Sequence, residues 1–246
     1  MFSFFKKKPE LSNLNRFISI DQDMHSHILP GIDDGAPDLA TSMELVKGLY
    51  ALGIRKTIAT PHVIGDMFRN SPETILPALK ILQDEVAREG MDLKISAAAE
   101  YMMDDYFLSL LKGKQPLLPI DKNIILTEFS YAIPPSNSDE ISFEIFTAGY
   151  QPILAHPERY SYFHGKKYKQ YHDLKDMGFL FQVNLLSVTG YYGIPVAKAA
   201  RYLLDNGMVD HVGTDMHHVR HLEALKGNLA IIHEAIGEGK YNEFGN

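Results

Sequence analysis

The feature that most constrains the fold is a repeated alternation of short apolar runs, amphipathic segments and glycines. Several of the apolar runs are almost continuously apolar, such as Ile124-Ile125-Leu126, which indicates strands buried on both faces, as in a parallel sheet. The predicted strands cover residues 21–25, 56–60, 93–98, 123–127, 151–155, 179–184 and 211–213. Apolar residues at helical spacing predict helices over residues 37–52, 72–88, 138–148, 168–177, 194–205 and 224–236.

A glycine follows five of these helices, where a left-handed C-cap is expected; these are Gly53, Gly90, Gly149, Gly178 and Gly207. The alternation predicts about seven βα units, and no Ser/Gly-rich linker divides them. With 246 residues, 45% of them hydrophobic, the chain can bury a full core. We therefore expect an α/β fold, a TIM-like distorted (β/α)7 barrel, as a single domain over residues 21–246 after an N-terminal tail of residues 1–20.

Charge and cysteine content exclude several classes of function. The formal net charge of −7 argues against a dedicated nucleic-acid surface, so we expect no nucleic-acid partner. The absence of cysteine excludes disulfides, thiolate metal sites and cysteine nucleophiles, and it is compatible with a cytoplasmic location.

The N-terminal tail combines aromatic and basic residues. Met1-Phe2-Ser3-Phe4-Phe5 precedes Lys6-Lys7-Lys8-Pro9, an order and length that do not fit a signal peptide. Two interpretations stay open: a frayed terminus, or a weak anchor that brings an otherwise cytoplasmic protein to a membrane surface.

The ends of the predicted strands carry side chains that can bind metal ions. Chemistry in such barrels lies at the C-terminal ends of the strands. The first strand ends in His25-Ser26-His27, where alternation points both imidazoles to one side. In the turn that follows, Asp38 is the better helix cap, which leaves Asp33 and Asp34 for other work. The other strand ends contribute His62, Glu100, Glu128, His156, Asp215 and His217.

Each of these residues alone is more often a cap, a surface charge or a hydrogen-bonded structural residue. Together they form a set of carboxylates and imidazoles that would be costly to bury at one level of a barrel without cations. Nitrogen and oxygen ligands without sulfur suit Zn, Mn or Fe. Nine candidate ligands exceed the needs of one ion, so we expect two or three ions, which would make hydroxide available for an in-line displacement near neutral pH. The nine are His25, His27, Asp34, His62, Glu100, Glu128, His156, Asp215 and His217.

At this point the motifs resemble the polymerase and histidinol phosphatase (PHP) superfamily. More narrowly, the sequence resembles bacterial manganese-dependent protein tyrosine phosphatases of capsule or exopolysaccharide synthesis. The resemblance spans residues 21–221, and the set is specific although each motif alone is weak. The matching motifs are the segment from His25 to Gly35, Thr60-Pro61-His62, Ala99-Glu100-Tyr101, Glu128-Phe129, the segment from His156 to Tyr160, Gln182-Val183-Asn184 and Thr214-Asp215-Met216-His217.

The resemblance implies a PHP-type barrel and roles for particular residues. It groups His25, His27, Glu100 and Asp215 on one ion, Asp34, His62 and His217 on a second, and Glu128 and His156 on a third that Glu100 bridges. It implies that Arg159 binds the substrate phosphate through its planar fork. Arg69 and Arg220 are weaker candidates for the phosphate site. The sequence departs from the family pattern at Val63 and His218, which affects the substrate side more than the metal ligands.

The function implied by the resemblance is hydrolysis of phosphotyrosine by a metal-activated hydroxide, with Mn as the expected metal and Fe or Zn as alternatives. The partner would be a phosphotyrosine-containing protein, such as a bacterial tyrosine kinase of polysaccharide export. The alternatives are a small-molecule phosphatase acting on a compound such as histidinol phosphate, a nuclease, a two-metal amidohydrolase, or a non-catalytic metal-binding scaffold. Composition disfavours the nuclease, and Asp34, Glu100 and Glu128 together exceed what an amidohydrolase needs.

Overall fold

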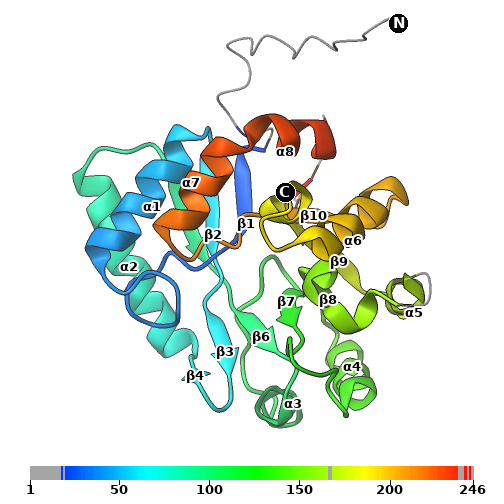
Figure 1. Ribbon diagram of the computed structural model, residues 1–246. Helices are drawn as coiled ribbons and strands as arrows, with labels where there is room; N and C mark the ends of the chain where they lie inside the picture. The colour runs from blue at the N-terminus through cyan, green and yellow to red at the C-terminus, as the bar shows by residue number, and fades with distance from the viewer. Residues whose placement is uncertain (1–17, 19, 166–167, 238–240, 243, 245–246) are drawn as a thin grey trace, which may run out of the picture.

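The strands form two sheets around which the helices are arranged. The computed structural model describes residues 18, 20–165, 168–237, 241–242 and 244 (Figure 1). The Phe/Lys segment of the tail lies outside the described residues, whereas Ile18 and Ile20 are buried in the core. No helix in the described part of the chain is long and apolar enough to span a bilayer.

The first sheet has the strand order β1-β2-β5, and the second has the order β10-β9-β8-β7-β6-β3-β4. All pairs are parallel except the β3–β4 hairpin. The strands are β1 (Gln22–Ser26), β2 (Lys56–Ala59), β3 (His62–Ile64), β4 (Phe68–Arg69), β5 (Lys94–Ala97), β6 (Glu100–Met102), β7 (Ile124–Glu128), β8 (Gln151–Ala155), β9 (Leu180–Asn184) and β10 (His211–Gly213).

The second and third positions of the barrel are each occupied by a strand that is broken in two. After β2 and β5 the chain leaves the first sheet, and β3 and β6 continue in the second sheet. Pro61 occupies the first break, where it has no N–H to donate to a ladder. Its carbonyl accepts a hydrogen bond from Glu100 N at 3.1 Å, so the two breaks lie side by side. His62 and Glu100 therefore begin new strands, paired with each other, instead of ending the predicted ones.

The barrel closes between β10 and β1. Asp215 N donates to His25 O at 2.8 Å, and His27 N donates to Met216 O at 2.8 Å. With β1, β2/β3, β5/β6, β7, β8, β9 and β10 in sequence order, the fold is the expected distorted (β/α)7 barrel. Its closure places the ends of the first and last strands side by side, and with them His25, His27 and Asp215.

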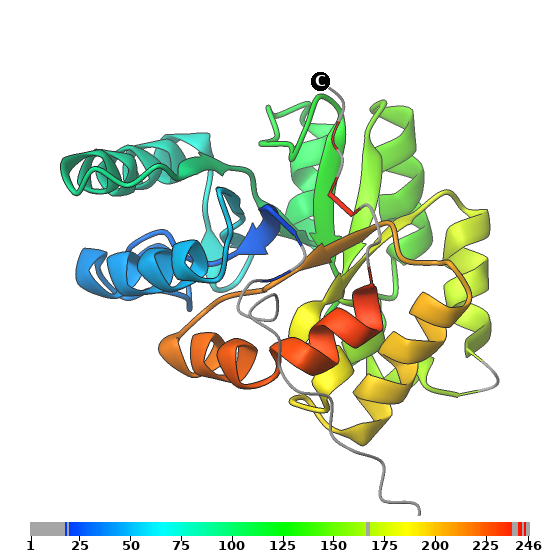
Figure 2. The same cartoon turned by 90° about the horizontal axis from the view of Figure 1, so that it is seen from above.

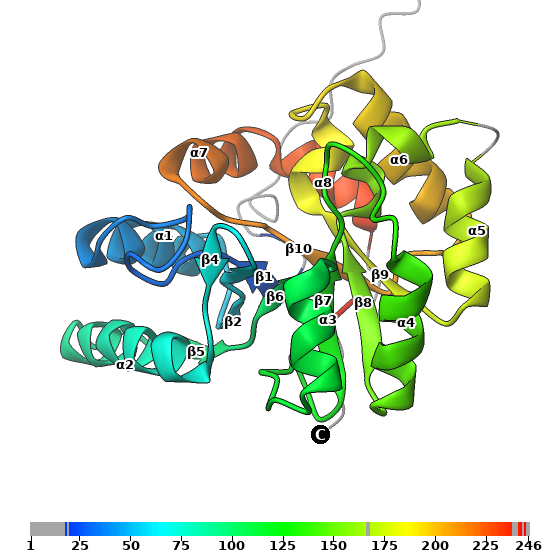
Figure 3. The same cartoon turned by 90° about the horizontal axis from the view of Figure 1, so that it is seen from below.

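The helices surround the strands on the outside (Figures 2 and 3). α1 packs against α2 and α7, and α3 against α4. Asp38 caps α1 by accepting a hydrogen bond from Thr41 N, as predicted. The five predicted C-cap glycines all have positive φ. The helices are α1 (Leu39–Ala51), α2 (Pro72–Arg88), α3 (Asp105–Lys112), α4 (Ser138–Thr147), α5 (Lys169–Asp176), α6 (Ile194–Asp205), α7 (Val219–Gly227) and α8 (Leu229–Ile236).

Two helix predictions differ from the structure. The single helix expected over residues 224–236 is two helices, α7 and α8, which meet at Asn228. The sequence interpretation also lacks α3, which Asp104 caps through its side chain.

Two apolar clusters hold the elements together. The larger cluster fills the space between the strands and the helices. The smaller one consists of strand residues and their neighbours, including Met24, Ile58, Leu126 and Ile153, and fills the interior of the barrel. Because the interior of the barrel is filled by apolar side chains, the polar candidate ligands lie at the C-terminal ends of the strands.

Candidate metal centre

The structure brings all nine predicted metal ligands into one cluster. They form four overlapping groups, within each of which the ligand atoms lie within 4.8 Å of one another. The groups are His27, Asp34, His62 and His217; His25, His27 and Glu100; His25, His156 and Asp215; and His62, Glu100 and Glu128. Except for Asp34 and His217, these residues are buried.

Glu100 lies at the centre of the cluster and approaches four imidazoles. Its Oε2 atom is 3.3 Å from His25 Nε2, 3.2 Å from His27 Nε2 and 3.1 Å from His62 Nδ1. Its Oε1 atom is 3.2 Å from His156 Nε2. A carboxylate with both oxygens directed at imidazole nitrogens on several sides could serve as a ligand to more than one ion.

Two observations indicate that these residues are suited to bind divalent metal ions. First, both oxygens of Glu100, Glu128 Oε1 and His62 Nδ1 are buried without a hydrogen-bond partner among the described residues, although nitrogen and oxygen atoms are close by. Leaving buried polar atoms unpaired is costly, and a bound cation would remove that cost. Second, ligands bound at about 2.1 Å to one ion lie about 3.0–3.4 Å apart, which is close to the separations around Glu100.

The groups overlap with those that the resemblance implies. Asp34, His62 and His217 lie together, with His27 added. Asp215 Oδ1 is 3.4 Å from His25 Nε2 and 3.5 Å from His27 Nε2. Glu128 is grouped with His62, since Glu128 Oε1 is 2.9 Å from His62 Nδ1. Glu128 Oε2 is 4.0 Å from His156 Nε2. His62 Nδ1 is therefore close to Glu100 and Glu128, which the implied assignment places on other ions.

Two candidate ligands have strained backbones. His156 directly follows β8, Asp215 comes two residues after the end of β10, and both adopt positive φ, 37° and 50°. Non-glycine residues are uncommon in this region, and the strain persists where the surroundings impose it, often at functional sites. In both cases the conformation turns the chain sharply after the strand, and the side chain faces the cluster.

Charge attraction within the cluster outweighs the cost of burial. Burial by itself would raise the pKa of Glu100, but attraction by His25 and His62 holds it well below its ordinary value. Burial and the charge of His62 lower the pKa of His27, but the nearby carboxylates of Asp33 and Glu100 have the larger effect and raise it to about 10. The metal-free cluster therefore keeps protons on imidazoles beside ionised carboxylates.

Asp33, whose role could not be predicted from the sequence, contacts the ring of His27. Its Oδ2 atom is 2.8 Å from His27 Nδ1 and also accepts a hydrogen bond from His62 N at 3.2 Å. A carboxylate on Nδ1 leaves Nε2 for a metal and fixes the orientation of the ring. Gly35 permits this turn, because a Cβ atom there would lie 2.1 Å from His27 O.

Gln182 and Asn184 connect two candidate ligands. Gln182 Oε1 is 2.8 Å from His25 Nδ1, and Gln182 Nε2 donates to Asn184 Oδ1 at 2.9 Å. Asn184 Nδ2 donates to Asp215 Oδ2 at 2.7 Å. The motif Gln182-Val183-Asn184 thus contributes contacts that orient His25 and Asp215.

Substitution of Gln182 by leucine is expected to weaken metal binding about 10- to 100-fold, because His25 Nδ1–H loses its acceptor. A Mn²⁺ titration by calorimetry measures the change. Gln151→Leu is the matched control, since Gln151 lies on β8 and its side chain bonds the carbonyl of Gly178 away from the cluster. Equal Mn²⁺ affinity in Gln182→Leu and the parent protein would contradict the orienting role.

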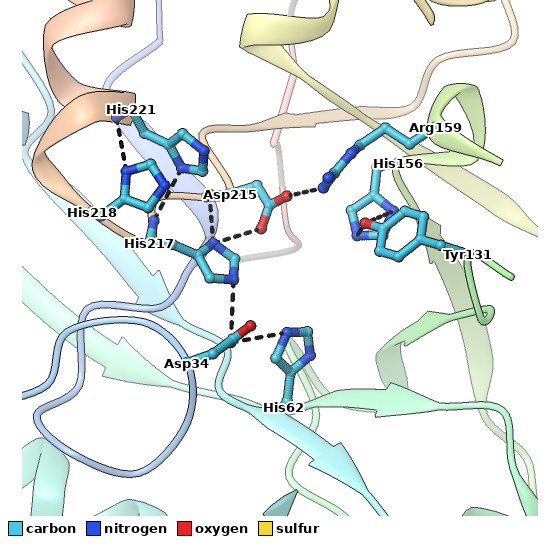
Figure 4. Close-up of a pocket in the computed structure, with 9 residues that line it drawn as sticks. All are labelled: Asp34, His62, Tyr131, His156, Arg159, Asp215, His217, His218 and His221. Carbon is cyan, nitrogen blue, oxygen red and sulfur yellow. Dashed lines mark hydrogen bonds and ion pairs between the residues drawn. The ribbon is translucent and has the colours of Figure 1, made fainter. Parts of the chain in front are cut away.

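The cluster opens into a cavity of about 300 Å³ (Figure 4). Arg159 lines this cavity, and its Nη1 atom donates to Asp215 Oδ2 at 2.9 Å. The other lining residues are Asp34, Tyr131, His62, His156, Asp215, His217, His218 and His221. Tyr131, His218 and His221 were not predicted as site residues.

The other two candidate arginines do not line the cavity. Arg69 is an exposed residue of β4, and its Nε atom donates to Gly65 O at 2.5 Å. Arg220 is exposed in the first turn of α7, beside His221. Of the three arginines, Arg159 has the geometry for direct contact with a group bound beside the metal cluster.

Comparison with known proteins gives consistent matches. Residues 21–244 match the family described as "Capsular polysaccharide synthesis, CpsB/CapC". The tyrosine-protein phosphatase CpsB of Streptococcus pneumoniae is 33% identical over 205 residues, which cover 80% of this chain and 83% of the relative. The tyrosine-protein phosphatase YwqE of Bacillus subtilis is 30% identical over 198 residues, which cover 80% of this chain and 78% of the relative.

A solved structure agrees with these relatives. It comes from work on YwqE of Bacillus subtilis and CpsB of Streptococcus pneumoniae, described as unique metal-dependent tyrosine phosphatases. It superposes with a TM-score of 0.77 at 28% identity, covering 88% of this chain and 87% of the other. The similarity therefore extends over the barrel and the strand ends that carry the cluster.

Proposed function

Because the chain belongs to the CpsB/CapC family of capsular polysaccharide synthesis, we propose that it hydrolyses phosphotyrosine in a protein of that process. It is a metal-dependent tyrosine-protein phosphatase. The observation that carries the assignment is Glu100, whose buried oxygens have no hydrogen-bond partner in the described chain and face four imidazoles. A structural role alone does not account for that arrangement.

We further propose that the nine clustered side chains hold two or three ions, with Mn ahead of Fe and Zn as the metal to test. Four overlapping ligand groups favour three ions, with Glu100 and His62 where the groups meet. Bound divalent ions supply a nucleophile, by lowering the pKa of water, and offset negative charge on the phosphoryl oxygens.

The residues of the chain position the substrate. Arg159 binds the phosphate oxygens through N–H groups of its planar fork, while Asp215 holds the guanidinium by Nη1. Asn184, the last residue of β9, donates a hydrogen bond to Asp215. The strand therefore orients Asp215, and Asp215 in turn orients Arg159. The leaving tyrosinate has a pKa of about 10, so it departs without a strong general acid. Arg69 and Arg220 are exposed outside the cavity, so they would contact the peptide residues that flank the phosphotyrosine.

The proposed physiological substrate is a tyrosine-phosphorylated protein such as the kinase of polysaccharide export. The cavity of about 300 Å³ is open enough to admit a phosphotyrosine side chain projecting from a polypeptide. Identification of the phosphoprotein that accumulates when this chain is removed from its host would test the partner.

Comparison of substrates tests the reaction itself. With Mn²⁺ present, kcat/KM for a phosphotyrosine peptide is expected to exceed that for histidinol phosphate and for an oligonucleotide by at least about tenfold, since an aryl leaving group and peptide contacts both favour it. Phosphate release from the three substrates, measured at equal metal concentration, shows which substrate class the protein prefers. A preference for histidinol phosphate would replace this proposal with a small-molecule phosphatase.

A further inference from the structure

Two tyrosine rings enclose the guanidinium of Arg159. Arg159 Cζ lies 4.2 Å from the ring centroid of Tyr192 and 4.7 Å from that of Tyr131. Tyr131 comes from the loop after β7, and Tyr192 from the loop before α6. Neither loop contributes a candidate metal ligand, and in the described part of the chain Tyr192 has no hydrogen bond or ring contact with one, whereas the Tyr131 hydroxyl lies 3.2 Å from His156 Nε2.

The contacts leave a defined part of the guanidinium available. An arginine side chain has five N–H donors in one plane. The rings lie against it at cation–π distance, and Asp215 takes Nη1 at 2.9 Å. Among the described residues no other acceptor receives a hydrogen bond from the guanidinium of Arg159. The remaining donors are therefore free for a ligand in the cavity that Arg159 lines (Figure 4).

We propose that Tyr131 and Tyr192 are positioning residues that clamp the guanidinium of Arg159 in the orientation in which it binds the substrate phosphate. This inference rests on the phosphate-binding role of Arg159 proposed above. An arginine that is free to rotate must be ordered each time substrate binds, and ordering it beforehand removes that cost. The rings also shield the charge from water, which strengthens its attraction for a phosphate.

The rings, and not their hydroxyl groups, account for this role at Tyr192. Tyr192 Oη is buried and has no hydrogen-bond partner in the described chain. A phenylalanine ring offers the same face to the cation without an unsatisfied hydroxyl. At Tyr131, which is 43% exposed, the ring also stacks on His156 with centroids 5.5 Å apart.

The test is a double-mutant cycle between each tyrosine and Arg159, using the full-length Mn²⁺-loaded protein. Tyr192→Leu is expected to lower kcat/KM for a phosphotyrosine peptide about tenfold, which corresponds to about 1.4 kcal/mol, and to weaken inhibition by inorganic phosphate. Tyr192→Phe should recover most of that loss. In an Arg159→Ala background, Tyr192→Leu should cost little more, because the residue through which it acts is absent.

Tyr50→Leu is the matched control. Tyr50 stacks on Arg55 with Cζ 4.1 Å from the ring centroid, an equivalent pair outside the cavity. This variant should keep the parent kinetics. Tyr131→Leu provides a second route if Tyr192→Leu fails to fold, because Tyr131 is 43% exposed and lies outside the apolar core. Metal content is measured for every variant, and it should be unchanged.

Two results would overturn the inference: losses that add fully in the Arg159→Ala background, or a Tyr192→Phe variant as impaired as Tyr192→Leu. A different result would remove its premise. If Arg159→Ala alone retains the parent kcat/KM, the phosphate-binding role of Arg159 fails, whatever the tyrosine variants do. The two failures are therefore distinguishable in one set of measurements.

Discussion

Removal of divalent ions by a chelator is expected to lower hydrolysis of phosphotyrosine peptide about a thousandfold or more, because the remaining side chains include no nucleophile of comparable strength. Mn²⁺ should restore the rate. The melting temperature should also fall by about 5–10 °C, since saturated metal sites stabilise a chain of this length by a few kcal/mol. Activity, elemental analysis and calorimetry on the same samples measure all three effects.

The pH dependence of metal binding has a defined sign. The pKa of His27 is raised to about 10 in the metal-free cluster, and those of His25 and His62 are also raised. In the metal-free protein these groups contribute stability that is full below about pH 6.5 and lost as pH rises through the folded pKa. A metal ion must displace their protons, so Mn²⁺ affinity should rise with pH above neutrality.

Full activity of a preparation shown by elemental analysis to be metal-free would contradict the expected dependence of hydrolysis on divalent ions.

The fold was largely predictable because its local signals agree. The strand 151–155 and the helices 72–88 and 194–205 have the predicted bounds, and the glycine after each long helix marks the next unit. The broken strands were not predictable from periodicity, since β3 and β6 have three residues each. Gly227-Asn228 did carry a signal for the boundary between α7 and α8, and Asp104 a signal for the start of α3.

The candidate ligands could be predicted from the sequence, but the residues that contact and orient them could not. Ligands lie where strands end, so His25, Glu128 and Asp215 could be placed from the strand pattern alone. The pairing of Asp33 with His27 depends on a turn, which brings the carboxylate back to the ring. Tyr131 and Tyr192 come from loops whose sequence has no period, and only the folded barrel brings them to Arg159. The grouping of ligands likewise depends on side-chain directions that strand assignments do not give.

Replacement of Arg159 by alanine is expected to lower kcat/KM for a phosphotyrosine peptide about a hundredfold or more, the effect of losing a charge-assisted, forked contact with the phosphoryl group. Metal content should be retained, because Asp215 keeps its hydrogen bond from Asn184 when Arg159 is removed. Glu100→Ala, by contrast, should lose both metal and rate, since it removes oxygens that face four imidazoles. Steady-state kinetics and elemental analysis separate the two classes of variant.

The conservative variant distinguishes a phosphate ligand from a simple ion pair. Arg159→Lys keeps a positive charge near Asp215 but lacks the planar fork, so it should recover little of the lost efficiency. Arg55→Ala serves as the control for removing a stacked arginine outside the cavity, and its kinetics should match the parent. If Arg159 were only a surface partner of Asp215, its loss would change stability slightly and leave kinetics near normal. That outcome would reject Arg159 as the phosphate ligand and make Arg220, which lies beside the cavity residue His221, the next arginine to substitute.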